Sequence, residues 1–209
     1  SNSTFLENKD FFIVTVPTPI NENKSPNIQA LESACSMIGN YLKPGNCVIF
    51  ESTVYPGLTE EICIPILEKT SNLKLNRDFS VGYSPERINP GDKQRKLPQI
   101  IKIVSASNPK ALKQVDQLYS SIITAGTHKV LSIRAAEAAK VIENTQRDIN
   151  IALMNELSML FHKMNIDFNE VLNQSEVHLF PTLYEGFGLG VLEAHNCKKV
   201  VLASKIKVL

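Results

Sequence analysis

A lysine and an asparagine stand one helical turn apart in the segment AAEAAKVIENTQRDIN, residues 135–150. Lys140 precedes Asn144 by four residues, and Arg147 follows three residues later. A helix would place all three side chains on one face. A fixed ammonium beside an amide can stabilise an oxygen that gains negative charge during a reaction. The plain alternative is a solvated lysine next to a surface asparagine, since helical lysines are mostly exposed. For Arg147 we expect only contacts along the helix face.

Charge and composition narrow the classes of partner. The chain has 209 residues, 43% of them hydrophobic, which is enough for a substantial core. Its 22 Lys and Arg nearly balance its 21 Asp and Glu, which argues against binding nucleic acid or an anionic membrane surface. The sequence contains no run of 18 apolar residues, and its polar start lacks the apolar stretch of a signal peptide. We therefore expect a cytoplasmic protein without a membrane partner.

The four cysteines argue against a metal site or a disulfide framework. Cys35, Cys47, Cys63 and Cys197 are scattered, without C-x-x-C spacing. We expect reduced thiols, with Cys35 and Cys63 on apolar helix faces in the core. No metal is predicted.

Short apolar runs alternate with longer helical patterns along the chain. The runs are rich in β-branched residues, as buried strands are, and each helical pattern repeats apolar residues at intervals of three and four. This alternation predicts an α/β fold with a mostly parallel, doubly wound, Rossmann-like sheet. The expected strands are 11–17, 47–53, 79–85, 100–106 and 128–133, and the expected helices include 27–42 and 108–123.

One helical pattern is much longer than the others. From about Ile133 to Met164 the sequence contains neither glycine nor proline. Such a helix would extend about 45 Å at 1.5 Å per residue. We expect it to bridge domains or to form a dimer.

Polar residues follow the first three predicted strands. Thr18 lies between two prolines after the first strand, Thr53 follows the second, and Glu86 and Arg87 follow the third. Open α/β sheets bind ligands at the carboxyl ends of their strands. Each segment alone is also an ordinary turn, but three in order favour a ligand site.

Four segments together resemble the UDP-glucose/GDP-mannose dehydrogenase family, and the bacterial UDP-N-acetylhexosamine 6-dehydrogenases in particular. They are FFIVTVPTPI, VIFESTVYPGLTEE, GYSPERINPGDK and AAEAAKVIENTQRDINIALMNE, within residues 10–173. The resemblance implies oxidation of carbon 6 of a UDP-aminosugar from alcohol to carboxylate with two NAD in succession. It also implies a role in making surface polysaccharide.

The resemblance also implies roles for individual residues. Lys140 and Asn144 would bind substrate and stabilise its oxyanion. Thr53 and Glu86 would contact the nicotinamide cofactor and serve in water positioning and general-base catalysis. Thr18 would contact the cofactor, and Arg87 the substrate or a partner subunit. In the family the long helix links two domains and forms the core of a homodimer.

Two expected features of the family are missing from this sequence. No G-x-G-type loop precedes the first strand, and no glycine-flanked cysteine is present to hold an aldehyde as a thiohemiacetal. We expect residues 1–133 to be the carboxyl-terminal part of the NAD-binding domain. We expect residues 134–173 to be the long helix and the start of the middle domain, and residues 174–209 to be a separate tail.

The tail resembles a different family. In SEVHLFPTLYEGFGLGVLEAHNCKKVVLAS, residues 175–204, Glu185 and Glu193 form the E-x7-E pattern of the donor-binding segment in retaining glycosyltransferases. Three hypotheses follow. The chain is part of a nucleotide-sugar dehydrogenase, which we prefer, or a non-catalytic dimeric scaffold left by truncation or fusion, or a glycosyltransferase piece.

Overall fold

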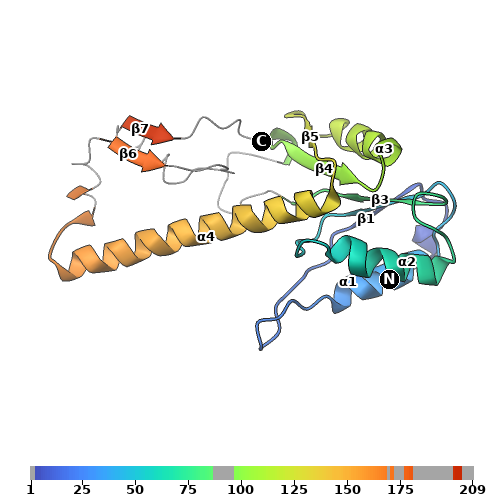
Figure 1. The fold of residues 1–209 in the computed structure, drawn as a ribbon, viewed down its shortest axis with the longest axis horizontal. Helices are drawn as coiled ribbons and strands as arrows, with labels where there is room; N and C mark the ends of the chain where they lie inside the picture. The colour runs from blue at the N-terminus through green and yellow to red at the C-terminus, as the bar shows by residue number, and fades with distance from the viewer. Residues whose placement is uncertain (1–2, 87–96, 169, 172–176, 181–199, 204–209) are drawn as a thin grey trace. The chain divides into compact units, whose positions relative to one another are not determined.

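The structure is a computed structural model that describes residues 3–86, 97–168, 170–171, 177–180 and 200–203 (Figure 1). The chain forms two compact units, Ser1–Val141 and Ile142–Leu209. No helix within the described ranges is both long enough and apolar enough to cross a membrane.

Five strands form the sheet of the first unit, in the order β1-β2-β3-β4-β5. Four of them lie within the predicted strands, and the fifth overlaps its prediction only at His128 and Lys129. Strands β1 to β3 are parallel, β4 runs antiparallel to β3, and β5 is parallel to β4. The expected parallel sheet therefore contains one reversal. The strands are β1 (Phe11–Val14), β2 (Cys47–Phe50), β3 (Ser80–Tyr83), β4 (Lys102–Ala106) and β5 (Thr127–Lys129).

The reversal places different strand ends together. The carboxyl ends of β1, β2 and β3 lie at one edge of the sheet, and the amino end of β4 lies at this edge too. We call it the carboxyl edge. The turns that carry Thr18, Thr53 and Glu86 all begin there.

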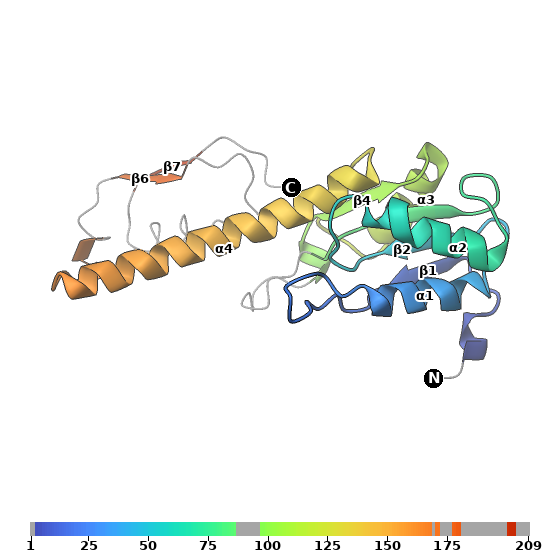
Figure 2. The same ribbon diagram turned by 60° about the horizontal axis from the view of Figure 1, so that its bottom comes forward.

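Helices cover both faces of this sheet. Figure 1 shows α1 (Gln29–Gly39) and α2 (Ile64–Ser71) on one side of the strands and α3 (Pro109–Ser120) on the other. A π-helical turn, η2 (Thr59–Cys63), leads directly into α2. In Figure 2, α1 and α2 lie side by side in front of the strands. The layered α/β fold is therefore confirmed.

The sheet has a hydrophobic cluster on each face, and alternating side chains of β2 pack into both clusters. Val48 and Phe50 pack in the cluster under α1 and α2, whereas Cys47 and Ile49 pack in the cluster under α3. Because both faces are buried, β2 appears in the sequence as a continuous apolar run. Cys35 and Cys63 lie in the first cluster with exposed fractions of 0% and 1%, so their prediction as core residues is confirmed. Cys197 lies outside the described residues.

A single 31-residue helix, α4 (Ile133–Lys163), matches the long helical pattern of the sequence. The boundary between the two units falls within it, after Val141. In the second unit, β6 (Val177–Phe180) pairs in parallel with β7 (Val200–Ala203). This pair lies within the segment for which we expected a separate tail.

An acid on α3 connects that helix to β5. Asp116 accepts hydrogen bonds from the Lys129 ammonium, at 2.8 Å, and from the Thr127 hydroxyl. The ammonium first, and the hydroxyl second, hold the pKa of Asp116 below its usual value. An unfolded aspartate titrates near pH 4 (about 3.9), so the bonds stabilise the fold above that pH. This contribution is lost as the pH falls through the lowered pKa of the folded state.

We expect Asp116→Asn to lower the free energy of unfolding by about 1–2 kcal/mol at pH 7. Because the carboxylate is protonated in acid, the difference from the native chain should shrink toward pH 2. Urea denaturation at both pH values measures it, with the exposed Glu7→Gln as a control that should change little. A deficit that stays constant from pH 7 to pH 2 would mean that the carboxylate charge is not its source.

Candidate active site at the carboxyl edge

Two hydroxyl groups join the first two turns of the carboxyl edge. The Thr18 hydroxyl donates a hydrogen bond of 2.6 Å to the carbonyl oxygen of Thr53, and the Ser52 hydroxyl donates one of 2.6 Å to that of Val16. The register aligns Val14 with Phe50, so the two turns leave the sheet side by side. Thr18 is half-buried and Thr53 is exposed. The structure therefore brings these two predicted residues together.

The third turn is fixed to the same place. The amide of Ser84 donates to the carbonyl of Phe50 at 2.9 Å, and the Tyr83 hydroxyl donates to the carbonyl of Ser52 at 3.3 Å. Glu86 follows two residues later and is half-buried. Arg87 lies outside the described residues.

The phenol of Tyr83 remains protonated in this arrangement. Burial first, and the nearby Glu137 carboxylate second, raise the pKa of Tyr83 well above its usual value. The hydroxyl therefore keeps its proton and its bond to Ser52 at any physiological pH.

Glu137 connects α4 to the turn after β2. Its side chain is completely buried, and its two carboxylate oxygens accept hydrogen bonds from the backbone amides of Gly57, at 2.6 Å, and Thr59, at 3.0 Å. The Thr59 amide begins η2 and the Gly57 amide lies two residues before it, and a helix amino terminus favours a negative charge. Gly57 has a φ of +99°, a conformation that suits glycine. The carboxylate thus fixes the first turn of α4 against the segment that contains Thr53.

Glu137 is not among the site residues that the sequence predicts. The available signal was its place in AAEAAK, three residues before Lys140, on a stretch that is otherwise alanine. An acid on such a face is usually solvated, and its two partners lie about 80 residues away in the sequence.

A second connection between the same segments is exposed. Arg134 bonds to Glu60 at 2.6 Å and to Glu61 at 2.7 Å, with 54% of its side chain exposed. Exposed ion pairs contribute little to stability because water screens them. Glu137 is therefore the stronger link.

Lys140 is buried, with 7% of its surface exposed. It belongs to the first unit, as Thr53 and Glu86 do. The alternative of a solvated lysine is thus wrong for this residue. Asn144 is half-buried and belongs to the second unit. Arg147 pairs with Glu143 on the same helix at 3.2 Å, as expected for a helix-face contact.

One hydroxyl near Glu137 has no hydrogen-bond partner. Among the described residues, the buried Thr59 Oγ1 is the single side-chain atom of this kind. We expect Thr59→Val to stabilise the fold by about 1 kcal/mol, because it removes an unsatisfied hydroxyl and keeps the shape and the backbone amide.

Thermal or urea unfolding measures the effect of Thr59→Val. Thr70→Val is the matched control, since the Thr70 hydroxyl donates to Ile66 at 2.7 Å and its removal should bring no gain. A Thr59→Val chain less stable than the native one would indicate that this hydroxyl has a partner.

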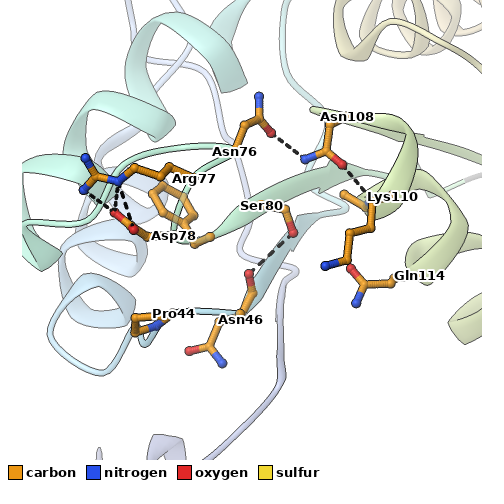
Figure 3. A pocket seen from close by; sticks show the side chains of 12 residues that line it. Pro44, Asn46, Asn76, Arg77, Asp78, Ser80, Asn108, Lys110 and Gln114 are labelled. Carbon is orange, nitrogen blue, oxygen red and sulfur yellow. Dashed lines mark hydrogen bonds and ion pairs between the residues drawn. The ribbon is translucent and has the colours of Figure 1, made fainter.

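A cavity of about 170 Å³ lies at the opposite edge of the sheet, next to the amino ends of β2 and β3 (Figure 3). Its polar groups are largely bonded to one another. The Asn108 amide donates to Asn76 at 2.7 Å, and the Asn108 oxygen accepts from the Ala111 amide at 2.8 Å, capping α3. These hydrogen bonds connect α3 to the turn before β3, and the cavity lies apart from the turns of the carboxyl edge.

Comparison with known proteins identifies the family. Residues 1–123 match the UDP-glucose/GDP-mannose dehydrogenase family, NAD binding domain, and residues 134–192 match the central domain of that family. The chain is 59% identical over 167 residues to UDP-N-acetyl-D-glucosamine 6-dehydrogenase of Pseudomonas aeruginosa, covering 80% of this chain and 40% of that protein. It is 55% identical over 163 residues to the Salmonella typhi protein of the same name, covering 78% and 38%.

A solved structure shares the fold. UDP-D-ManNAc dehydrogenase from Pyrococcus horikoshii superposes with a TM-score of 0.75 at 32% identity, over 82% of this chain and 40% of that one. This chain thus spans about two fifths of the relatives it matches.

The central-domain match includes much of the expected tail. It extends to residue 192, within the segment that we compared with glycosyltransferases. That resemblance has no support, and both Glu185 and Glu193 lie outside the described residues. The two family matches show that the chain belongs to the UDP-glucose/GDP-mannose dehydrogenase family, with residues 1–123 corresponding to its NAD binding domain.

Proposed function

We propose that this chain is part of an NAD-dependent enzyme that oxidises carbon 6 of a UDP-N-acetylhexosamine to the carboxylate. The observation that carries the proposal is the buried Lys140 on a helix that Glu137 fixes to the turn of Thr53. A buried ammonium is costly unless it faces negative charge or polar groups. Such a group suits a site where an oxygen becomes anionic.

Each predicted site residue has a role in this proposal. Lys140 and Asn144 donate hydrogen bonds to the reacting sugar oxygen and stabilise its negative charge. Glu86 accepts a proton from the hydroxyl or from a water that Thr53 orients. Thr18 contacts the cofactor, and Arg87 contacts the substrate. NAD supplies the acceptor for the hydride.

The turns of the carboxyl edge fit the nicotinamide end of such a cofactor. Thr18 and Thr53 are joined by a hydrogen bond, and the Thr53 side chain remains exposed. Ligands of open α/β sheets bind at this edge. The match to an NAD binding domain over residues 1–123 supports the same assignment.

Sequence identity favours the glucosamine epimer as substrate. The Pseudomonas aeruginosa and Salmonella typhi relatives, named for UDP-N-acetyl-D-glucosamine, are 59% and 55% identical to this chain. The Pyrococcus horikoshii protein, named for UDP-D-ManNAc, is 32% identical. We therefore propose UDP-N-acetylglucosamine.

A chimeric enzyme tests the proposal. The matching 167 residues of the Pseudomonas aeruginosa relative are replaced by those of this chain, so that the relative supplies the remainder. NADH formation from NAD and UDP-N-acetylglucosamine is followed by absorbance, with UDP-N-acetylmannosamine as the comparison sugar. We expect two NADH per glucosamine substrate and slower turnover of the mannosamine. A folded chimera that produces no NADH, beside an active parent enzyme, would contradict the proposal.

We also propose a homodimer formed through the second unit. Five apolar side chains, each at least 50% exposed, form a stripe along α4 and the residue after it. They repeat at intervals of seven and four, an 11-residue period that keeps them on one face of a nearly straight helix. A second copy in antiparallel orientation would cover the stripe with itself. The stripe residues are Ile142, Ile149, Leu153, Leu160 and Met164.

A charge in the centre of the stripe tests the dimer. We expect Leu153→Glu to weaken self-association at least about tenfold, because two carboxylates would be buried against apolar groups. Light scattering after gel filtration gives the mass. Asp148→Asn, about a third of a turn away from the stripe on the same helix, should leave the mass unchanged. A native chain that is monomeric at high concentration would rule out the dimer.

A further inference from the structure

A buried ammonium lies at the carboxyl edge, outside the predicted site. Lys102 is the first residue of β4, with 4% of its surface exposed. Because β4 runs antiparallel to β3, the amino end of β4 lies beside the carboxyl ends of the preceding strands. The desolvation of such a charge costs several kcal/mol, so its surroundings must compensate it.

Three groups compensate this charge. The Lys102 ammonium nitrogen lies 3.2 Å from a Glu51 carboxylate oxygen, 3.5 Å from the carbonyl oxygen of Ser84, and 4.9 Å from the centre of the Tyr119 ring. The Tyr119 hydroxyl donates to the same Glu51 oxygen at 2.5 Å. Burial first, and the bond to Glu51 second, raise the pKa of Tyr119 above its usual value, so the phenol remains a donor.

Two of these partners begin the turns of the proposed site. Glu51 precedes Thr53 by two residues, and Ser84 precedes Glu86 by two residues. One ammonium therefore contacts both chain segments just before the residues that face the cofactor. We propose that Lys102 is a positioning residue that holds the turns of Thr53 and Glu86 at a fixed separation. The inference rests on the proposed function for the roles of these two residues.

A role in stability alone explains this arrangement poorly. Replacing a buried ion pair with apolar groups of similar volume is often neutral or stabilising. Lys102 contacts two segments that leave different strands, and a lysine side chain that bridges them constrains their distance directly. Tyr119 limits the freedom of Glu51 from the side of α3.

The test compares Lys102→Met/Glu51→Gln with the native chain. This double variant removes both charges together and leaves an amide that still accepts from Tyr119. Hydrogen exchange is measured at two edge amides, those of Glu51 and Ser84, which donate to Val14 and Phe50 at 2.9 Å each. We expect both to exchange about tenfold faster, with a changed Thr53 methyl signal in the NMR spectrum. The melting temperature should remain close to that of the native chain.

Several controls distinguish a local effect on the two turns from a destabilisation of the whole sheet. The Cys47 amide, bonded to Asp10 at 2.9 Å near the opposite edge, is the internal reference and should not change. Lys102→Arg keeps the positive charge, so this variant should show the native Thr53 signal and the native exchange rates at both edge amides. Lys129→Met/Asp116→Asn removes an ion pair elsewhere on the sheet, 2.8 Å long, and should leave both edge amides unchanged.

Two results would overturn the inference. Native exchange rates at the Glu51 and Ser84 amides of the double variant would do so, as would equal acceleration at Cys47. If the double variant fails to fold, Lys102→Gln/Glu51→Gln decides, because it also removes both charges together and keeps a polar side chain at each position. Faster exchange at both edge amides supports the inference, and native rates refute it. None of these measurements needs NAD or sugar, so a failure of the proposed function would be seen separately.

Discussion

Glu137→Leu is expected to destabilise the first unit by about 3–5 kcal/mol, the cost of breaking a buried charged interaction from one side. The substitution leaves the amides of Gly57 and Thr59 buried without their acceptors, 2.6 Å and 3.0 Å from the present carboxylate oxygens. Each unsatisfied buried donor costs about 1–3 kcal/mol. Urea denaturation followed by circular dichroism measures the loss.

Two variants make this result specific to the buried carboxylate. Glu137→Gln keeps one good acceptor and loses the charge at the helix amino terminus, so we expect about half of the destabilisation. Glu61→Leu removes an acid from the same turn whose side chain is 55% exposed and should cost less than about 1 kcal/mol. A Glu137→Leu chain within about 1 kcal/mol of the native chain would show that Glu137 does not hold the turn.

Lys140→Met in the chimeric enzyme is expected to reduce kcat about 100- to 1000-fold. This is the typical loss when one preorganised donor to a developing oxyanion is removed. Methionine has a similar length and apolar character, so the buried position remains filled. Because the donor acts mainly in the transition state, the KM for the sugar should change much less than kcat. Steady-state NADH formation gives both constants.

The controls distinguish a loss of catalysis from a loss of folding. Lys163→Met removes an exposed lysine from the end of the same helix and should leave kcat unchanged. Melting curves of both variants establish that the fold persists. A folded Lys140→Met enzyme that loses less than about tenfold in kcat would exclude Lys140 as the oxyanion donor.

Much of the fold could be predicted because it depends on local pattern. Apolar runs rich in β-branched residues predicted the strands β1 to β4, and a strand such as β2 that is covered on both faces needs apolar side chains at every position. The polar β5 overlaps its predicted run at only two residues. The absence of glycine and proline from 133 to 164 predicted α4 to within one residue at its carboxyl end. Four motifs in order also predicted the family, which the comparisons establish.

Strand direction could not be predicted in the same way. The run that became β4 appears similar to its neighbours in the sequence, because hydrophobic pattern reports burial and does not report which way a strand runs. Only the sheet pairing, with Gly82 aligned to Ala106 in an antiparallel ladder, determines that Lys102 lies at the carboxyl edge. The position of the proposed site follows from the sequence alone, since the three turns that define it follow parallel strands.

The sequence by itself determined the strands, the long helix, the family and the turns that carry Thr18, Thr53 and Glu86. The tertiary structure decided which charged side chains are buried. Glu137 resembles an ordinary surface charge when read with its sequence neighbours, and Lys102 is a single charge in an apolar run that does not reveal its partner. Their partners Gly57 and Glu51 lie tens of residues away, and folding alone brings the compensating groups close enough to stabilise a charge removed from water.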